Sequence, residues 1–362
     1  MDVFVLGLAL APARTRAAGE RLEEMVFTVT RAALDDAGVE RAAIDQVTLA
    51  ACDELDGRSI SSMLLAMPAG AYLKDEMKCT DSGLTGLCLG ATRLAAGPFG
   101  LGLVVSWNKS STAPFEDVMR MRAEPFFTRP IGLNAAIADG LFAGAVAAAY
   151  GFSEHDATRQ VLDNAARAAR NPRAATKPAP SEQAIAASPY LAYPLRQGHR
   201  APLSDGAVAM VLASGDWLAR HPAARPLARI AGLGWSVASY QLGRERLAGL
   251  SSLHEASSRA LGMAGIDLAA LDVLELDSQT GWHDAAYRRV FAEADPAALS
   301  PSGGAFAQNP YFCTGLVGAA EAVLQTAQRA GPVQRPRPAW AAAQGAHGYA
   351  QQGQVVAVFE RV

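Results

Sequence analysis

The chain contains the stretch Ala37-Gly38-Val39-Glu40-Arg41-Ala42-Ala43-Ile44-Asp45-Gln46-Val47 and, in its second half, a near copy, Ala264-Gly265-Ile266-Asp267-Leu268-Ala269-Ala270-Leu271-Asp272-Val273-Leu274. Each copy follows a segment with helical apolar spacing and runs into an apolar, strand-like segment. The two copies are much farther apart than the roughly 20 to 50 residues that separate solenoid repeats. The pattern therefore predicts two copies of one α/β unit, with a ligand site where the two halves meet.

Composition limits the classes of function. The chain has 362 residues, 50% of them hydrophobic, and a net charge of −3 with lysines and arginines spread along the sequence. This length allows two domains or one large two-part body. The charge disfavours nucleic acid and anionic membranes as main partners. The longest apolar runs are shorter or more interrupted than a membrane span requires, so no span is expected.

The N-terminal run at residues 3–11 is apolar enough to compare with a signal peptide. Asp2 precedes it, no basic segment does, and Arg14 and Arg16 follow it. A buried first strand is therefore expected. The four cysteines show no CxxC spacing, which indicates reduced thiols in a cytoplasmic protein without a disulfide framework or a metal site. They are Cys52, Cys79, Cys88 and Cys313.

Strand and helix patterns alternate twice along the chain, which predicts parallel sheets with helices on their faces. A loop-rich region with breaker residues interrupts the first half, including a linker at 172–180. Further expectations include a helix at 60–73 that Pro68 kinks or breaks, and a Ser82 or Asp81 cap on a helix from Gly83. The predicted units are 1–107 (first half), 108–200 (inserted loop region), 201–225 (closing strand of the first half) and 226–362 (second half).

Four motifs then occur in order: Thr80-Asp81-Ser82-Gly83, Ala201-Pro202-Leu203-Ser204-Asp205-Gly206-Ala207, Ser300-Pro301-Ser302-Gly303-Gly304 and Gln344-Gly345-Ala346-His347-Gly348. Together with the duplicated pattern, they resemble the thiolase superfamily, specifically its sterol-carrier-type branch. The resemblance implies duplicated βαβαβ halves in a five-layered αβαβα body with an inserted loop domain. It also implies a coenzyme A thioester as substrate, no covalently bound cofactor, and a homodimer formed through the strand near 101–105.

The chain departs from the family pattern at its reactive positions. Thr80 stands where the family has its nucleophilic cysteine, and Cys79 is one residue early, so alternation along an extended segment predicts that Cys79 faces away from the pocket. The family's Gly-His-Pro is absent. Its second cysteine falls near Ala343, and Asp277 aligns with its Asn or His. These departures remove the thiolate route that thiolysis requires.

A branch of the superfamily that lacks the cysteine is similar in these loops. It contains aldolases that cleave β-hydroxyacyl-CoA side chains together with a small partner protein carrying a zinc ribbon and an OB-fold. Retro-aldol cleavage needs a base for the β-hydroxyl proton and donors for the enolate oxygen. The helix start at Gly83 and the turn at Gly345 are expected to supply backbone N–H donors.

Five side chains are candidates for the base, and each has a structural alternative. Tyr311 lies at the position where the family's loop histidine would reach the pocket; alternatively, it is an aromatic residue that packs after a turn. His347 lies between glycines, or is an exposed turn histidine. Tyr349 is either catalytic or a tyrosine at an interface. Asp277 is either catalytic or a hydrogen-bonding group in a loop. His283 is either functional or part of the start of a helix. Thr80 completes the catalytic set.

A second set of residues is expected to bind the substrate. Asp81 is either a catalytic acid or the cap of a helix. Gly303 and Gly304 allow the backbone to approach closely, either to a ligand or to the other half of the protein. The set is Asp81, Ser82, Gly83, Gly303, Gly304, Gly345 and His283.

Three functions stay open at this point. The first is a lyase that cleaves β-hydroxyacyl-CoA by retro-aldol chemistry. The second is an acetyl-CoA acetyltransferase-type enzyme with displaced catalytic residues, using Cys79 or Cys88. The third is a non-catalytic subunit that binds acyl-CoA or a partner. Sensitivity to thiol alkylation separates the first two.

Overall fold

A computed structural model describes residues 2–175 and 178–362. Nine strands form one mixed sheet in the order β3-β2-β4-β7-β1-β8-β11-β10-β9, and β5 and β6 form a separate pair. The strands are β1 (Val3–Leu10), β2 (Gln46–Ala50), β3 (Asp75–Cys79), β4 (Leu101–Lys109), β5 (Tyr190–Ala192), β6 (Leu195–Arg196), β7 (Asp205–Ser214), β8 (Ala228–Val237), β9 (Val273–Glu275), β10 (Trp340–His347) and β11 (Gly353–Glu360).

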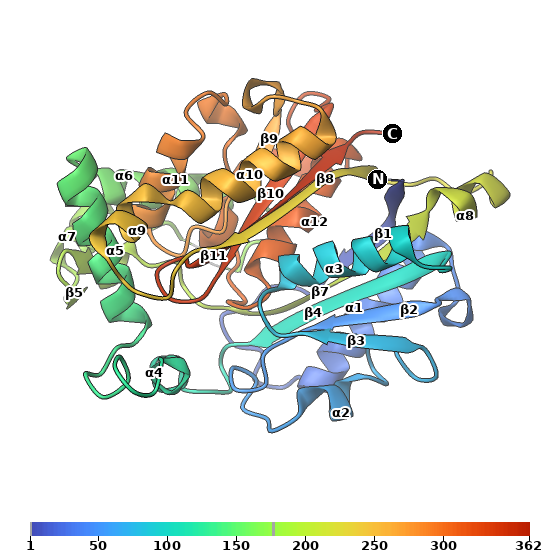
Figure 1. The fold of residues 1–362 in the computed structure, drawn as a ribbon, viewed down its shortest axis with the longest axis horizontal. Helices are drawn as coiled ribbons and strands as arrows, with labels where there is room; N and C mark the ends of the chain where they lie inside the picture. Colours follow the sequence, from blue (N-terminus) through green and yellow to red (C-terminus); the bar gives the residue numbers. More distant parts are fainter. Residues whose placement is uncertain (1, 176–177) are drawn as a thin grey trace.

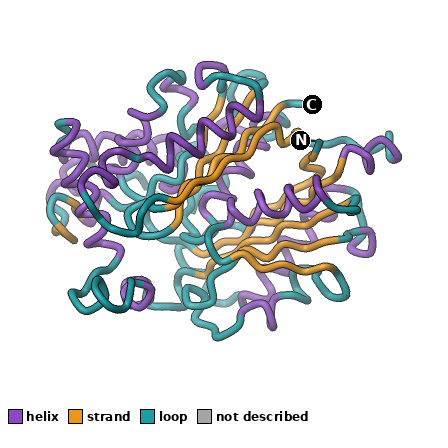
Figure 2. Tube along the Cα trace, viewed as in Figure 1, coloured by secondary structure: helices purple, strands orange, loops and turns teal. Residues whose placement is uncertain are grey.

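Twelve α-helices surround the sheet within the described residues. They are α1 (Leu22–Ala37), α2 (Ser61–Leu65), α3 (Gly83–Ala96), α4 (Phe115–Arg122), α5 (Ala135–Tyr150), α6 (Glu154–Ala168), α7 (Glu182–Ala187), α8 (Gly215–Arg220), α9 (Arg244–Gly249), α10 (Ser251–Ala264), α11 (Gly281–Val290) and α12 (Thr314–Thr326). Figure 2 shows how helices, strands and loops alternate along the chain.

The two halves have the same strand order when each is followed outward from their junction. The first half runs β1-β7-β4-β2 and the second runs β8-β11-β10-β9. In both, the first two pairings are antiparallel and the third is parallel. The predicted duplication is therefore confirmed. The prediction of parallel sheets is wrong, because the strand that closes each half returns antiparallel between two others.

Helices form three layers around the strands (Figure 1). The helix α1 packs on β1 and β7 of the first half, and α10 packs on β8 and β11 of the second. The helices α3 and α12 contact each other and lie between the two halves of the sheet. This is the five-layered αβαβα arrangement that the resemblance implies, and it confirms the α/β fold class.

The repeated stretch has the same structure in both halves. The helices α1 and α10 end at Gly38 and Gly265, both left-handed with φ of 66° and 73°, a conformation that glycine adopts without a steric penalty. Each is followed by a 3-10 turn and then by β2 or β9. The side chain of Asp45 accepts hydrogen bonds from the N–H groups of Gly100 (2.7 Å) and Leu101 (3.0 Å) at the start of β4.

Asp272 makes the equivalent contacts in the second half. Its Oδ2 accepts hydrogen bonds from the N–H groups of Ala339 (2.7 Å) and Trp340 (3.0 Å) at the start of β10. The backbone N–H of Asp272 also donates to the carbonyl of Trp340 at 3.0 Å. The repeated aspartate therefore fixes where the next parallel strand begins.

The inserted region lies at one end of the molecule, where α5, α6 and α7 are drawn in green (Figure 1). Arg173 fastens its return segment to the second half through two hydrogen bonds to Glu321, from Nε (2.8 Å) and Nη2 (2.5 Å). Arg173 belongs to the predicted 172–180 linker, of which residues 176–177 lie outside the described residues. No single described helix is long and apolar enough to cross a bilayer; α5 and α6 meet that test only as a pair bent by 113°.

Three local expectations are wrong. The helix expected at 60–73 is only the five residues of α2; it ends before Pro68, which lacks an N–H donor and was one expected place for a break, and Gly70 is left-handed with φ of 78°. The strand β10 continues to His347, where a loop was expected. The segment 101–105 lies within β4, between β2 and β7, and is fully buried, so it presents no free edge for a dimer.

We expect Asp272→Ala to lower the free energy of unfolding by about 1–3 kcal/mol, because two backbone N–H groups at the start of β10 lose their acceptor. Urea unfolding followed by circular dichroism measures this change. Asp267→Ala is the matched control: this exposed carboxylate precedes the same turn and makes no cap hydrogen bond. Equal effects of the two substitutions would contradict the role of Asp272.

Candidate active site

A cavity of about 170 Å³ lies where the start of α3, the inserted helix α4, the loop before α12 and the end of β10 come together. It therefore sits between the two halves, as the duplication predicts. Polar and titratable side chains make up much of its wall. The lining residues are Leu55, Asp81, Ser82, Met119, Arg122, Tyr311, Phe312, Ala346, His347, Gly348, Tyr349 and Gln352.

The start of α3 brings Asp81 and Ser82 to the cavity. Ser82 is the N-cap, and its Oγ accepts a hydrogen bond from the N–H of Thr85 at 3.2 Å, as expected of a serine at this position. The N–H of Gly83 donates to the carbonyl of Phe312 at 2.9 Å. That donor is already used within the protein, which differs from its expected role toward a substrate oxygen.

Tyr311 enters the cavity from the loop before α12. Its ring packs edge-on against Phe115 of α4, with 4.6 Å between ring centroids. Burial raises the pKa of the Tyr311 hydroxyl, and the carboxyls of Asp139 and Asp277 raise it further. Tyr311 therefore stays protonated at neutral pH and acts as a hydrogen-bond donor.

His347 is the last residue of β10 and pairs with Gly353 of β11. A Cβ atom at Gly353 would lie 2.1 Å from Cε1 and Nε2 of the imidazole, so the ring occupies space that only glycine leaves free. Burial lowers the pKa of His347, the Asp81 carboxylate opposes this shift, and Arg122 adds to it. The imidazole is therefore neutral at neutral pH and able to accept a proton.

Tyr349 and Arg122 close the cavity on the side of the insertion. The Tyr349 hydroxyl donates to the backbone carbonyl of Met119, and burial raises its pKa to about 12. Arg122 contacts the thiol of Cys52, and its Nη1 lies 3.4 Å from Oε2 of Glu54. Sequence reasoning missed Arg122, whose only signal is that it is one of the two arginines of α4.

Asp277 lies directly behind the wall. Its Oδ2 accepts from the N–H of Ala346, a lining residue, at 3.2 Å, and its Oδ1 accepts from Nε2 of Gln279 at 2.5 Å. Burial raises the pKa of Asp277 to about 6, while these hydrogen bonds lower it. The carboxylate orients the end of β10 and does not line the cavity, so its contacts match the hydrogen-bonding alternative.

Gly345 and Gly315 serve close packing below the cavity. A Cβ atom on Gly345 would lie 3.1 Å from Cβ of Leu84, and one on Gly315 would lie 3.0 Å from Cα of Gly345. Such contacts are too tight for a larger side chain. Gly345 therefore allows β10 to approach α3 and α12, and it lies in a strand instead of the expected glycine turn.

The expected nucleophile position is not in the cavity. Thr80 is exposed, whereas Cys79 is buried in an apolar cluster with Leu55, Met119 and Phe312. The side chains of Cys79 and Thr80 therefore face opposite to the expected directions. Burial raises the pKa of the Cys79 thiol, so it is not a thiolate at neutral pH. None of the four cysteines lines the cavity.

Three other expected residues lie elsewhere. His283 is fully buried on α11, with its Nε2 3.6 Å from Oδ1 of Asp139, and burial lowers its pKa to about 3. Gly303 and Gly304 are left-handed turn residues whose missing side chains allow close approach to the backbone of Ala168 and Leu276. They serve contacts between segments of the protein and do not line the cavity.

The described residues contain no group of three or more His, Cys, Asp or Glu side chains placed to hold a metal ion. The residues that do meet are two tyrosines, a neutral histidine, an arginine and an aspartate. This set can accept a proton, donate hydrogen bonds and stabilise negative charge.

No protein-family model matches the chain, and no curated protein sequence matches it. Solved structures do match. Human mitochondrial 3-ketoacyl-CoA thiolase in complex with CoA superimposes with a TM-score of 0.81 and 17% identity, over 100% of this chain and 98% of that one. Another structure of human mitochondrial 3-ketoacyl-CoA thiolase superimposes with a TM-score of 0.82 and 17% identity, over 100% of this chain and 99% of that one. The chain therefore has the thiolase fold over its full length.

We expect Gly353→Ala to displace the His347 imidazole from its half-buried position, because the new methyl group overlaps the ring. The pKa of His347, now held low by burial, should then rise toward its ordinary value of about 6.5. An NMR titration of the imidazole signals measures this shift. Gly262→Ala is the control, since nothing lies near that position in α10. An unchanged His347 titration in Gly353→Ala would contradict the steric argument.

Proposed function

We propose that this protein cleaves the bond between the α- and β-carbons of a β-hydroxyacyl-CoA by retro-aldol chemistry, without a covalent acyl-enzyme. The single observation that carries this proposal is the content of the cavity. Acid–base and hydrogen-bonding side chains line it, and no cysteine does. The fold supports an acyl-CoA substrate, since a similar structure is a 3-ketoacyl-CoA thiolase in complex with CoA.

In the proposed reaction the neutral His347 imidazole takes the proton of the β-hydroxyl group. The electrons of that O–H bond form a new carbonyl at the β-carbon as the carbon–carbon bond breaks. The bonding pair moves to the α-carbon and is delocalised onto the thioester oxygen as an enolate. The imidazolium then returns its proton to the α-carbon, which yields a shorter acyl-CoA and an aldehyde or ketone.

Arg122 and Tyr311 are suited to hold the enolate oxygen. Arg122 carries a permanent positive charge, and Tyr311 keeps its proton because its pKa is raised. Tyr349 is committed to the carbonyl of Met119, so it positions α4 against the end of β10. Asp277 orients the same strand through Ala346. This assignment uses Tyr349 and Asp277 as positioning residues.

The cavity has room for the thioester end of a substrate and not for all of CoA. A second, more open cavity of about 640 Å³ is lined by Phe115 and Arg200, among others, and the ring of Phe115 packs on Tyr311. We propose that the nucleotide portion of CoA lies there, with Arg200 near its phosphates. Arg200 is held by Glu116 of α4, with 2.6 Å between Nη1 and Oε1.

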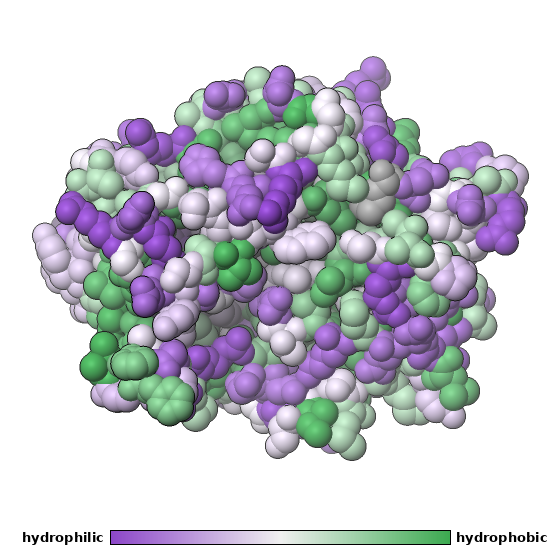
Figure 3. Space-filling model, viewed as in Figure 1, coloured by the Kyte–Doolittle hydropathy of each residue, from purple (hydrophilic) through white to green (hydrophobic). Residues whose placement is uncertain are grey.

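A homodimer, a zinc-ribbon and OB-fold partner protein and a cytoplasmic location stay predictions. Exposed apolar side chains support association with another chain. The loop after α4 exposes Phe126 (80%), Phe127 (73%) and Ile131 (80%). Figure 3 shows hydrophobic surface at its lower left, where Figure 1 draws this loop.

The acyltransferase alternative requires a thiolate, and the structure offers little support for one. Cys79 and Cys88 are both buried, and burial raises the pKa of both thiols. A non-catalytic role would not explain why the cavity contains a neutral histidine, His347, and a protonated tyrosine, Tyr311. It is the outcome if CoA thioesters bind and none is cleaved.

We expect the protein to convert β-hydroxyacyl-CoA compounds into a shorter acyl-CoA and a carbonyl product, detected by mass spectrometry across substrates with different β-substituents. Iodoacetamide should leave the rate unchanged, because the four thiols are buried. His347→Gln should lower the rate by about 100-fold or more. Cys79→Ala, checked for folding, is the control that retains activity. Inactivation by iodoacetamide together with a dead Cys79→Ala would support the acyltransferase.

The rate should fall only below pH 6.5, since His347 must be neutral and burial holds its pKa below that value. Asp81→Asn should move this acid limb to still lower pH, because the Asp81 carboxylate is the charge that raises the His347 pKa. Asp216→Asn, an exposed carboxylate on α8, is the control. The pH profile of kcat/KM measures both. A limb that shifts upward in Asp81→Asn would overturn the assignment of His347 as base.

A further inference from the structure

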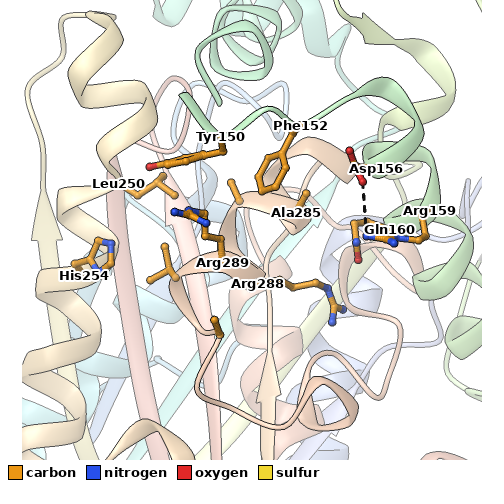
Figure 4. Close-up of a pocket in the computed structure, with 13 residues that line it drawn as sticks. Tyr150, Phe152, Asp156, Arg159, Gln160, Leu250, His254, Ala285, Arg288 and Arg289 are labelled. Atoms are coloured by element: carbon orange, nitrogen blue, oxygen red, sulfur yellow. Dashed lines mark ion pairs between the residues drawn. The ribbon is translucent and has the colours of Figure 1, made fainter. Parts of the chain in front are cut away.

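A third cavity, of about 750 Å³, lies on the outer side of the inserted region between the end of α5, the first turns of α6, the start of α10 and the last turns of α11 (Figure 4). It is lined by Tyr150, Phe152, Asp156, Arg159, Gln160, Leu250, His254, Ala285, Ala286, Arg288, Arg289, Val290 and Ala292. It shares no residue with the candidate active site.

Three arginines make this cavity positively charged. Arg289 points its guanidinium into the cavity beside Tyr150, 4.5 Å above the ring centroid, and no described carboxylate lies within 4.0 Å of it. Arg288 is held by Asp284 at 2.5 Å, and its Nη2 is buried without a hydrogen-bond partner among the described residues. Arg159 makes a loose ion pair of 3.7 Å with Asp156. Arg289 is thus the guanidinium of the three that meets no described carboxylate, and Figure 4 shows it extending away from Arg288.

The start of α10 adds to the positive potential. The helix has 14 residues, its N-cap Leu250 is left-handed with φ of 48°, and no side chain caps its first N–H groups. The positive end of the helix dipole therefore faces the cavity at Leu250. His254 follows in the first turn and also lines the cavity.

The wall that continues from Tyr150 is apolar. The rings of Tyr150 and Phe152 lie 5.8 Å apart at an angle of 54°. Buried Leu250, Ala285 and Ala286 continue this surface. An inorganic anion would leave this wall unused, whereas a ligand with a ring or acyl body would cover it.

We propose that this cavity binds an organic phosphate whose aromatic or acyl body rests on Phe152, beside Tyr150, and whose phosphate meets Arg289. Arginine forks and a helix N-terminus both recognise phosphate oxygens. A phosphate offers enough oxygens to engage several of these donors at once, which a carboxylate with two oxygens does less well. The proposal concerns a separate site and does not depend on the proposed reaction.

Isothermal titration with phenyl phosphate tests this proposal on the full chain. Phenyl phosphate should bind more tightly than inorganic phosphate, benzoate or benzyl alcohol, because only it has both the phosphate and the ring. Arg289→Met should weaken its binding by about tenfold, as expected for one charge-assisted hydrogen bond. The control Arg16→Met removes an exposed arginine in the first half of the chain and should leave the affinity unchanged.

Two further variants assign the binding to this cavity. Phe152→Ala should weaken phenyl phosphate more than inorganic phosphate, because it removes only the ring contact. His347→Gln, in the candidate active site, should have no effect. The proposal is overturned if phenyl phosphate does not bind, if Arg289→Met binds it as the wild type does, or if His347→Gln abolishes binding. Equal affinity for benzoate would overturn the choice of phosphate.

Discussion

The close contact between the two central helices is the constraint on which the rest of the structure depends. At Gly83, a Cβ atom would lie 3.0 Å from Cβ of Leu316 and 3.2 Å from Cα of Cys313. Gly315 meets Leu84 and Gly345 in the same way. Only residues without side chains allow α3 and α12 to begin side by side between the two halves of the sheet. The cavity lies at these two helix starts, so its position follows from this contact.

Most of the fold could be predicted from the sequence, because it depends on short local motifs that occur in both halves. The Ala-Gly turns after α1 and α10 and the aspartates Asp45 and Asp272 occur in both halves and have the same contacts. The directions of the closing strands were not predictable, because apolar runs look alike in parallel and antiparallel sheets. The strand β3 was missed since its Asp, Glu and Lys are mostly exposed at the edge of the sheet.

The residues of the candidate site could be predicted only where they lie in or next to a recognisable motif. His347 belongs to one of the four motifs, Tyr349 follows that motif directly, and Tyr311 was inferred from the place of the family's loop histidine; all three line the cavity. Arg122 comes from an inserted helix that packs across the cavity, a long-range contact that no local pattern reveals. Thr80 was misplaced because strand alternation gives two opposite faces, and the choice between them depends on burial that only the fold defines.

The pairing of His347 with Gly353 has a consequence for how the protein would bind a ligand. The imidazole is held against the backbone of β11 before any ligand arrives, so its rotational freedom is already lost on folding. Ordering a mobile side chain at a binding site costs roughly 0.5–1.5 kcal/mol of affinity. Here that entropy is lost on folding, when β10 pairs with β11, so in the proposed reaction the imidazole would already be in place before a ligand binds.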